Sequence, residues 1–336
     1  MEKVGIASLS LFLVCGVLFS TAIGADPPER SLAYRAGKAD SLISCRAIAG
    51  QMLRKTVFQE LSGKIQGDLP PGAKGPELPG LVSAAALPEV VSEQWNGETY
   101  SLRVTVPSDL KAIRDRVIAL QKDALWGQDL RGAWDRAELA KTQLLRLNHR
   151  FSEEEPTGDD LVTHALLVNK LFAERFFAEG VFLTQSKLND LAIAAFSRSI
   201  KDKPDHAASF LGRGAARLLI QSPSSPVAAA GPGPGSDSTG LDAAPRLSDY
   251  STPKTTEVYS HYAFPGQGRL EEAIEDFSQA IRYKPDLARA YLLRGQAYER
   301  DGQNENALSD YEKYSQVAPD DPLAGQYLEK LRKKIQ

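Results

Sequence analysis

The chain has 336 residues, of which 42% are hydrophobic and 25% are charged, and its formal net charge at pH 7 is −3. This composition is ordinary for a globular protein, and the length gives room for two domains. The sequence has no basic stripe of the kind that binds a phosphate backbone, so we expect no nucleic-acid partner. Four histidines and two cysteines leave little material for a metal cluster.

The first 24 residues have the features of an export signal. A charged start precedes an uncharged apolar run, Val4 to Ile23, and the run ends in small residues that suit cleavage before Ala25. If it stayed uncleaved, a run of about 20 apolar residues could just span a bilayer. We therefore expect a signal peptide over 1–24 and an exported protein, periplasmic or otherwise extracytoplasmic. A membrane-anchored form is the alternative, and membrane contact is expected only through this segment.

The two cysteines are not expected to form a disulfide within the mature chain. Cleavage would remove Cys15 and leave Cys45 alone. Cys45 lies among apolar residues, so the sequence predicts a buried small hydrophobic side chain at this position.

Residues 25–127 predict a small α+β domain with the order helix, hairpin, helix. A helical stripe of apolar residues runs through 31–66 and begins at Leu32, Ala36, Ala39 and Ile43. Further on, Asn96-Gly97 is the favoured pair for a hairpin turn, and alternating apolar residues follow it up to Val106. Ser108 and Asp109 are good helix-start residues, so a second helix is expected after the hairpin.

The Ala-rich helix AGKADSLISCRAIAGQML and a hairpin that ends in a Tyr-x-Leu-x-Val run resemble small domains of bacterial envelope lipoproteins and flagellar-assembly proteins. The resemblance covers residues 31–125. Two strands alone are only marginally stable in water, so we expect either a further edge strand or a partner here.

Residues 128–172 predict a helical connector. An apolar stripe at helical spacing includes Leu130, Trp134 and Phe151, and the acidic break SEEEPTGDD separates it from a helix that begins near Leu161. We expect these helices to cover the first face of the repeats that follow, because end repeats need a cover.

The segment 288–321 has small and aromatic residues at the spacing of a helix–turn–helix repeat. In its first helix these are Tyr291, Gly295 and Tyr298, and in its second they are Ala307, Tyr311 and Pro319. Small residues let two helices approach closely, and a proline ends the second helix because it cannot donate the next hydrogen bond. The segment resembles a tetratricopeptide (TPR) repeat.

Two earlier repeats follow from the period of about 34 residues. Residues 173–206 form the first, with Gly180, Ala192, Phe196 and Pro204 at the matching positions. The middle repeat has Gly214 in its helix A and Ala273, Phe277 and Pro285 in its helix B. Its two halves are separated by about 47 residues more than the period allows. The extra Pro/Gly/Ser-rich stretch, 222–266, predicts a disordered low-complexity insertion in the turn of this repeat.

The predicted fold class is mainly α, with a C-terminal TPR α-solenoid and a small N-terminal α+β unit. The solenoid has about three repeats, and the middle one is split by the insertion. The predicted divisions are a signal peptide at 1–24, the α+β domain at 25–127, a helical cap or connector at 128–172, the first repeat with helix A of the second at 173–221, the insertion at 222–266, and helix B of the second repeat with the third repeat and a C-terminal capping helix at 267–336. In that last helix, PLAGQYLEKLRKK, we expect Leu323, Tyr327 and Leu331 to face inwards.

No catalytic constellation is visible in the sequence. The phosphate-loop, zinc-helix and nucleophile-elbow motifs are absent, and no pair of histidines shows ligand spacing. His206 follows Pro204-Asp205 in a connection between repeats, where an exposed position is expected. We therefore expect a non-catalytic protein without cofactor, metal or small-molecule substrate. A hydrolase with an unrecognised site in 25–150 is the least favoured alternative.

In TPR proteins the concave wall is made by helix A of each repeat, so the resemblance implies a partner groove in this chain. The residues carried over to this wall are Phe177, Val181, Leu211, Ala215, Leu218, Arg289, Leu292, Gln296 and Arg300. TPRs that clamp a chaperone's C-terminal carboxylate need Lys and Asn where this chain has Phe177 and Val181, so that partner class is disfavoured. An apolar helix or an extended peptide is expected instead.

Together these features predict an exported TPR scaffold or adaptor that binds another envelope protein or peptide through the groove. The alternative is a structural subunit of a larger envelope assembly, in which the groove has no separate ligand.

Overall fold

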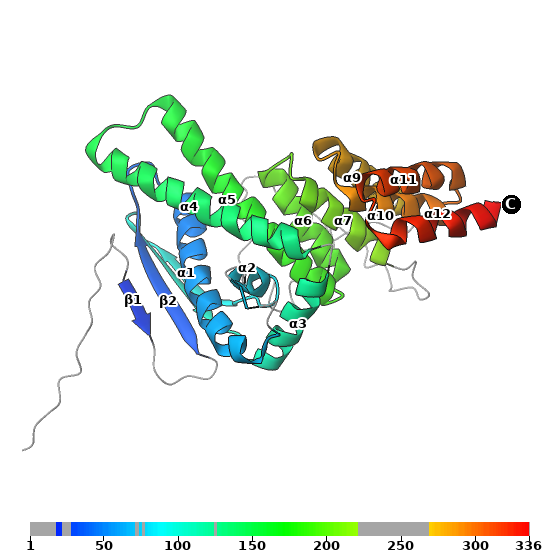
Figure 1. Ribbon diagram of the computed structural model, residues 1–336. Helices are drawn as coiled ribbons and strands as arrows, with labels where there is room; N and C mark the ends of the chain where they lie inside the picture. The colour runs from blue at the N-terminus through cyan, green and yellow to red at the C-terminus, as the bar shows by residue number, and fades with distance from the viewer. Residues whose placement is uncertain are drawn as a thin grey trace, which may run out of the picture.

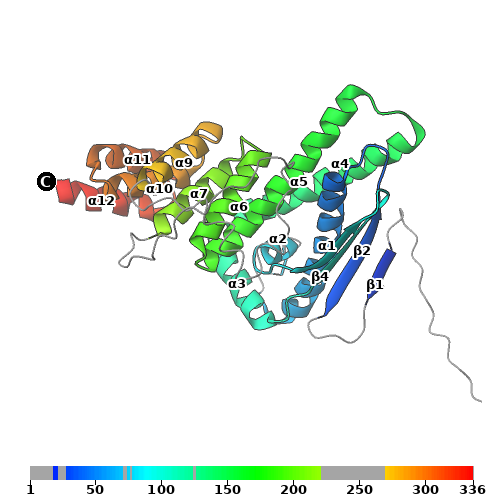
Figure 2. The ribbon, with the colours of Figure 1, turned by 180° about the vertical axis from the view of Figure 1, so that it is seen from behind.

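The protein is described by a computed structural model that covers residues 18–21, 28–70, 74–75, 78–123, 126–220 and 269–335. A small sheet with helices packed on it lies at one end, and a stack of helices extends from it to the C-terminus (Figures 1 and 2). The predicted fold class is confirmed, because the chain is mainly helical and its only described strands lie in the N-terminal unit. The insertion and most of the predicted signal segment lie outside the described residues.

The sheet has four antiparallel strands in the order β1-β2-β4-β3. The strands are β1 (Leu18–Thr21), β2 (Glu29–Arg35), β3 (Val90–Trp95) and β4 (Thr99–Thr105). The predicted hairpin is confirmed: β3 pairs with β4, and Gly97 in their turn has φ +95°, a backbone conformation that favours glycine. The Asn96 carboxamide oxygen accepts hydrogen bonds from the backbone N–H groups of Glu98 and Thr99 and so closes the turn.

Strand β2 corrects the predicted helix over 31–66. Residues 29–35 pair with β4, with Leu32 opposite Leu102, and the helix begins only at Leu42. Leu32 and Tyr34 are buried while the residues between and after them are more exposed, which is the alternation of a strand. Leu32 and Ala36 also have the spacing of one helix face, so the local sequence does not distinguish a strand from a helix here. β2 is the further strand that the hairpin required, and it lies beside β4 and not beyond β3.

Three helices complete the N-terminal unit. They are α1 (Leu42–Ile65), α2 (Leu78–Ser83) and α3 (Leu110–Lys122), and a short 3₁₀ turn, η1 (Gln66–Asp68), follows α1. Ser41 caps α1 through a reciprocal pair of hydrogen bonds with Ser44. Helix α1 covers one face of the sheet, where Ile48 and Phe58 share a core with Tyr100. The α3 helix begins after its cap Asp109, as predicted.

Helices α4 (Gly127–Glu153) and α5 (Gly158–Gln185) form an antiparallel hairpin. The joined ends of the two helices project beyond the rest of the molecule in both views (Figures 1 and 2). Thr157 caps α5 in a capping box with Asp160. Because α5 continues without a break to Gln185, the connector helix and helix A of the first repeat are one continuous helix.

The remaining helices form the stack. They are α6 (Asn189–Asp202), α7 (Ala207–Leu219), α9 (Arg269–Tyr283), α10 (Ala288–Arg300), α11 (Asn304–Val317) and α12 (Pro322–Ile335). Helices α7 and α9 pack on each other although the predicted insertion separates them in sequence. In α12, Leu331 is fully buried as expected, but Leu323 is 42% exposed, so the prediction for Leu323 was wrong. Leu323 lies in the first turn of α12.

A buried carboxylate ties the N-terminal unit to the α4–α5 hairpin. Asp40 accepts hydrogen bonds from the Tyr34 hydroxyl at 2.9 Å, the Ser44 hydroxyl at 2.8 Å and the Asn148 side-chain nitrogen at 2.8 Å. His164 Nε2 lies 3.2 Å from Asp40 Oδ1, the oxygen that also accepts from Ser44. Burial alone would raise the pKa of Asp40, but these hydrogen bonds outweigh burial and lower the pKa.

The main core continues from the sheet into the first repeat. One cluster of buried side chains includes Leu102 of β4, Val57 of α1, Leu144 of α4 and Phe196 of α6. The core therefore crosses residues 127 and 172, where the sequence suggested divisions. Smaller clusters lie between α7, α9 and α10 and between α11 and α12.

Candidate functional site: the TPR helix wall

The stack repeats one close contact three times. A Cβ atom built on Gly180 would lie 2.6 Å from the Phe196 ring, one on Gly214 would lie 2.7 Å from the Phe277 ring, and one on Gly295 would lie 2.6 Å from the Tyr311 ring. Real Cβ atoms do not approach so closely, so each helix A needs glycine where the aromatic ring of helix B crosses it. The three pairs define three helix–turn–helix units at the predicted positions.

Two of the repeats each have an ion pair with a buried aspartate next to this contact. Arg213 Nη2 lies 2.7 Å from Asp276 Oδ1, and Arg294 Nη2 lies 2.8 Å from Asp310 Oδ1. Arg217 also pairs with Asp276, so this buried carboxylate has two cationic partners.

The first repeat has Glu179 where the other two have arginine. Glu179 is 1% exposed and lies beside two cations, Arg54 of α1 and Arg175 of α5. Burial raises the pKa of Glu179 although both arginines oppose that shift. Burial and the neighbouring Arg175 lower the pKa of Arg54 to about 9. The Glu179 carboxylate thus lies beside a cation of the N-terminal unit, Arg54.

The predicted wall of the first repeat is covered by the chain itself. Phe177 and Val181 are fully buried. The Trp126 ring lies 6.3 Å from the Phe177 ring and 6.2 Å from the Phe196 ring, and Arg116 of α3 stacks over Phe182 at 4.7 Å. The corner between α3 and α4 therefore occupies the surface where a partner was expected. This differs from the predicted open wall, and the sequence had no local sign of it.

The wall of the second repeat is also packed. Leu211 is fully buried, and Ala215 and Leu218 are each 8% exposed. Leu211 and Leu218 belong to the core shared with α9 and α10. These side chains fill the space between successive helices, so they too differ from the predicted accessible groove. Leu219, at the end of α7, is 55% exposed.

The third repeat keeps part of its wall accessible. Arg289, Leu292 and Gln296 are partly exposed and Arg300 is exposed. Gln296 Nε2 donates to the Tyr327 hydroxyl of α12 at 3.0 Å, and Arg300 Nη1 donates to the Leu218 carbonyl at 2.9 Å. We call Arg289, Leu292, Gln296 and Arg300 the repeat-3 wall.

Acidic residues of the α3–α4 corner lie near Arg289 of this wall. Burial lowers the pKa of Arg289, and the nearby Asp123 and Asp129 oppose that shift. Burial also raises the pKa of Asp129, although Lys284 and Arg289 oppose the shift. The repeat-3 wall therefore carries charges of both signs at its inner end, beside an apolar Leu292.

A second buried network holds helix A of the first repeat in place. Glu174 accepts from Arg136 Nη2 at 2.7 Å, and His206 Nε2 lies 3.3 Å from the same carboxylate. His206 Nδ1 lies 2.7 Å from the Ser209 hydroxyl, which lies 2.7 Å from the Ser199 hydroxyl. His206 is 4% exposed, so the expectation of an exposed histidine was wrong. His206 immediately precedes α7, and the Phe177 ring of α5 packs against its imidazole.

This Ser–His–Glu arrangement resembles a catalytic relay but its proton directions differ. The Ser199 hydroxyl donates to the Ala173 carbonyl at 2.7 Å. The proton between the two serines must then come from Ser209, and His206 Nδ1 must donate to Ser209. A general base cannot take a proton that is already committed to Ser199, and the Ser209 side chain has no exposed surface for a substrate. The network joins α4, α5, α6 and α7.

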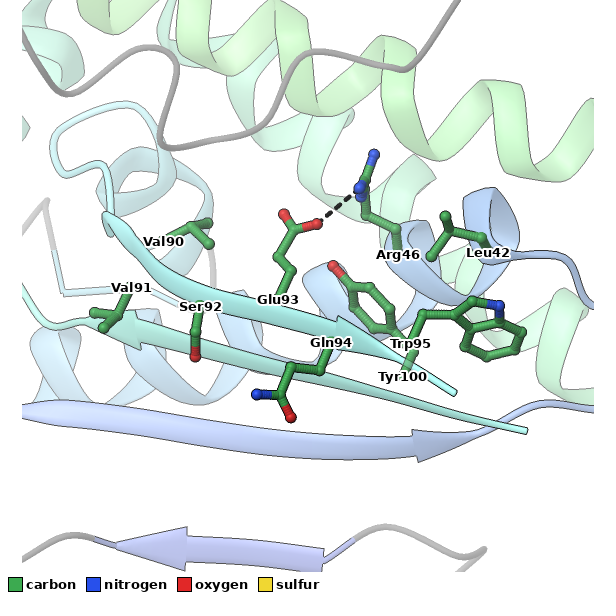
Figure 3. Close-up of a pocket in the computed structure, with 9 residues that line it drawn as sticks. All are labelled: Leu42, Arg46, Val90, Val91, Ser92, Glu93, Gln94, Trp95 and Tyr100. Carbon is green, nitrogen blue, oxygen red and sulfur yellow. Dashed lines mark ion pairs between the residues drawn. The ribbon is translucent and has the colours of Figure 1, made fainter. Parts of the chain in front are cut away.

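A cavity of about 260 Å³ lies at the outer edge of the sheet (Figure 3). Glu93 of β3 and Arg46 of α1 point toward each other across it, with 2.7 Å between Arg46 Nη2 and Glu93 Oε2. Its apolar lining comes from Leu42, Val90 and Trp95. An inward-pointing charge and the register shift between Val90 and Ser92 are devices that protect an edge strand from further pairing.

The described residues contain no group of three or more His, Cys, Asp or Glu side chains that could hold a metal ion. In that same part of the chain, no helix is both long and apolar enough to cross a bilayer. Cys45 is free and fully buried, as the sequence predicts.

Comparison with known families assigns the repeats. Residues 263–302 match the model described as "TPR repeat", and residues 288–321 match the model described as "Tetratricopeptide repeat". The C-terminal region of this chain is built from TPR repeats. The matches confirm the TPR resemblance, and neither covers residues 31–125. Residues 173–206 also fall outside both matches, but their Gly180–Phe196 contact is like the Gly295–Tyr311 contact of the matched third repeat.

Two solved structures of MamA are similar to this chain. One is MamA 41-end from Desulfovibrio magneticus RS-1 and the other is a MamA RS-1 ArsTM double mutant. Each is 17% identical, covers 60% of this chain and 85% of its own, and has a TM-score of 0.33. A TM-score of this size does not establish a common overall fold. No curated protein matches the chain.

Proposed function

We propose that this protein is a scaffold whose TPR stack binds a protein or peptide partner at the repeat-3 wall. TPR repeats are stacked modules whose extended surfaces bind other proteins. The proposed location depends on one observation: the wall residues of the three repeats differ in their exposure to solvent. Phe177, Val181 and Leu211 are fully buried, whereas all four residues of the repeat-3 wall keep solvent contact.

The chemistry of the wall favours a partner with one apolar anchor and polar flanks. Leu292 offers an apolar contact, and Arg300 of the same helix reaches the Leu218 carbonyl, next to the exposed Leu219. Arg289 and Arg300 supply donors, while Glu299 supplies an acceptor that Tyr311 and Lys334 already contact. An amphipathic helix or an extended peptide matches this mixture, because each places one apolar side chain between polar neighbours.

The test is capture of partners from an extract of the source cells with the full chain as bait. Leu292→Glu combined with Leu219→Glu places two carboxylates on the proposed surface. Neither leucine is fully buried, but Leu292 packs against the cluster of Ala307, Tyr311 and Leu331, so the folding of the variant has to be compared with wild type. The control is Lys313→Glu, because Lys313 is exposed on α11, outside helix A. We expect the double variant to lose a partner that wild type and control both retain, and circular dichroism should show equal folding of all three.

Capture of the same proteins by the double variant would contradict the proposed site. The structural-subunit alternative makes a different prediction, because a subunit buried in an assembly would be recovered with several proteins at fixed ratios. In that case substitutions on α11 would disturb recovery as much as those on the repeat-3 wall.

We also propose that the protein is exported by the segment 1–24. The support is the charged start, the apolar run and the small residues before Ala25. N-terminal sequencing of the protein from the native organism should begin at Ala25, in which case the mature chain lacks strand β1 (Leu18–Thr21). A chain that begins at Met1 and remains in the cytoplasmic fraction would contradict export.

A further inference from the structure

An uncharged apolar surface lies on the projecting half of α5. Three of the most exposed large apolar side chains fall within six residues: Leu161 is 46% exposed, Val162 is 60% exposed and Leu166 is 63% exposed. Ala165 and Asn169 are exposed as well, and the sequence from Leu161 to Asn169 carries no acidic residue, lysine or arginine. Single exposed apolar residues are normal on a protein surface, but a group of this kind marks a contact.

The exposed side chains form one line along the helix. Val162, Leu166 and Asn169 have the i, i+4, i+7 spacing of a single helix face, and Ala165 lies beside them. His164 and Val168 point to the opposite side, where they are buried. We call Val162, Ala165, Leu166 and Asn169 the α5 stripe. The hairpin that carries the stripe projects from the body, so another molecule can reach it (Figures 1 and 2).

The charges at the ends of the stripe are arranged for a second copy of the same helix. Asp159 lies one turn before the stripe and Lys170 directly after it, about 16 Å apart along the helix axis. Their midpoint lies between His164 and Ala165, at the centre of the stripe. Two α5 helices packed antiparallel around this point would bring Asp159 of each copy to Lys170 of the other. A parallel arrangement would instead place Asp159 beside Asp159 and Lys170 beside Lys170 of the other copy.

We infer that the protein forms a two-fold symmetric dimer through antiparallel contact of the α5 stripes. The small Ala165 lies near the axis and lets the two helix backbones approach, while Val162 of each copy packs beside Leu166 of the other. Each copy supplies the same surface, so the contact is closed and does not propagate. This contact is separate from the repeat-3 wall, which lies at the far end of the chain.

The first measurement is sedimentation velocity of the full chain from about 1 to 200 µM, a range suited to a contact smaller than a standard interface. We expect a concentration-dependent dimer. Leu166→Glu should weaken it by at least about tenfold, because a carboxylate would be buried in the apolar contact. Leu139→Glu is the matched control, because Leu139 is exposed on α4 but lies outside the stripe. Thermal melting should be alike for all three proteins.

A charge exchange tests the orientation. Asp159→Lys alone and Lys170→Asp alone should each weaken the dimer, because like charges then face each other. The double variant Asp159→Lys/Lys170→Asp should restore it, since both antiparallel pairs are re-formed with the signs exchanged. Dimers that the double variant does not restore would overturn the antiparallel arrangement.

Three results would overturn the dimer itself. The first is a wild-type monomer at every concentration. The second is a dimer that Leu166→Glu leaves unchanged. The third is a monomer that binds neutral lipid vesicles through the stripe, which would assign the surface to a membrane. None of these results bears on the repeat-3 wall, whose test is partner capture.

Discussion

At the scale of single residues, the glycines of the TPR stack carry a defined packing role. Gly180, Gly214 and Gly295 each face an aromatic ring of helix B closely enough to exclude a methyl group. Each ring is fully buried, so it cannot move aside without opening a void. A glycine in a helix normally costs about 0.5–1 kcal/mol relative to alanine. The close approach of the two helices offsets that cost.

Gly295→Ala should therefore destabilise the protein. The new methyl group would lie 2.6 Å from Tyr311, and overpacking of this kind costs about 1–3 kcal/mol. Gly325→Ala is the matched control, because Gly325 lies in helix α12 with nothing within 4 Å of the added atom. Chemical denaturation should show a loss for Gly295→Ala and a gain of about 0.5–1 kcal/mol for Gly325→Ala. Equal effects at both sites would contradict the packing role.

At the scale of elements, pairings distant in sequence decide what each segment becomes. β2 is a strand because β4, about 70 residues later, offers it a complementary edge. α7 and α9 form one repeat because Phe277 and Asp276 of α9 reach Gly214 and Arg213 of α7. The intervening chain adds only a slowly rising loop-closure cost, so a long insertion is compatible with the repeat.

The α5 helix shows how one element serves two environments. Its second half is helix A of the first repeat and is almost completely buried. Its first half leaves the body and exposes an uncharged face, while His164 on the other side contacts Asp40. The buried side of this half is covered by the protein itself, whereas the exposed apolar side is not. The proposed dimer would cover the exposed side.

At the scale of the whole molecule, buried carboxylates hold the N-terminal unit, the hairpin and the stack together. Asp40 joins β2 and α1 to α4 and α5, and Glu174 joins α5 to α4 and α7. Burial would raise the pKa of Glu174, but hydrogen bonds from His206 and Arg136 outweigh it and lower the pKa. For both groups the folded-state pKa is thus below the unfolded value.

A lowered carboxyl pKa contributes stability that is present above the unfolded pKa, about 3.9 for Asp. The contribution is lost as the pH falls through the lower folded pKa. Asp40→Asn should therefore cost stability at neutral pH, and the difference from wild type should shrink as the pH falls below about 4. Urea unfolding of both proteins over a pH series measures this difference directly. Glu179 and Asp276, whose pKa values are raised, act in the opposite direction, but they are common to both proteins and cancel.

The Asp40 prediction has its own control and its own refutation. Glu154→Gln, which changes an exposed carboxylate on the same hairpin outside the proposed dimer contact, is the matched control. A gap between wild type and Asp40→Asn that stays constant down to low pH would mean that the carboxylate charge plays no part in the contact.

The sequence by itself determined the repeat positions, the hairpin and the start of α3 after Asp109. Their signals are local: a glycine lies 16 residues before its aromatic partner in Gly180–Phe196 and Gly295–Tyr311, and Asn96-Gly97 closes a turn within four residues. Such contacts depend on spacing, which can be counted along the chain. The same counting placed Gly214 and Phe277 in one repeat despite the insertion.

Only the tertiary structure decided which of the predicted wall residues remain accessible. Phe177 and Val181 are both fully buried, and the ring that packs on Phe177 belongs to Trp126, more than 50 residues earlier. His206 is buried because Glu174 and Ser209 come to it from two different helices. Exposure is a property of everything that packs around a residue, so no local pattern encodes it. That is why the candidate site moved to the third repeat although the predicted fold class was confirmed.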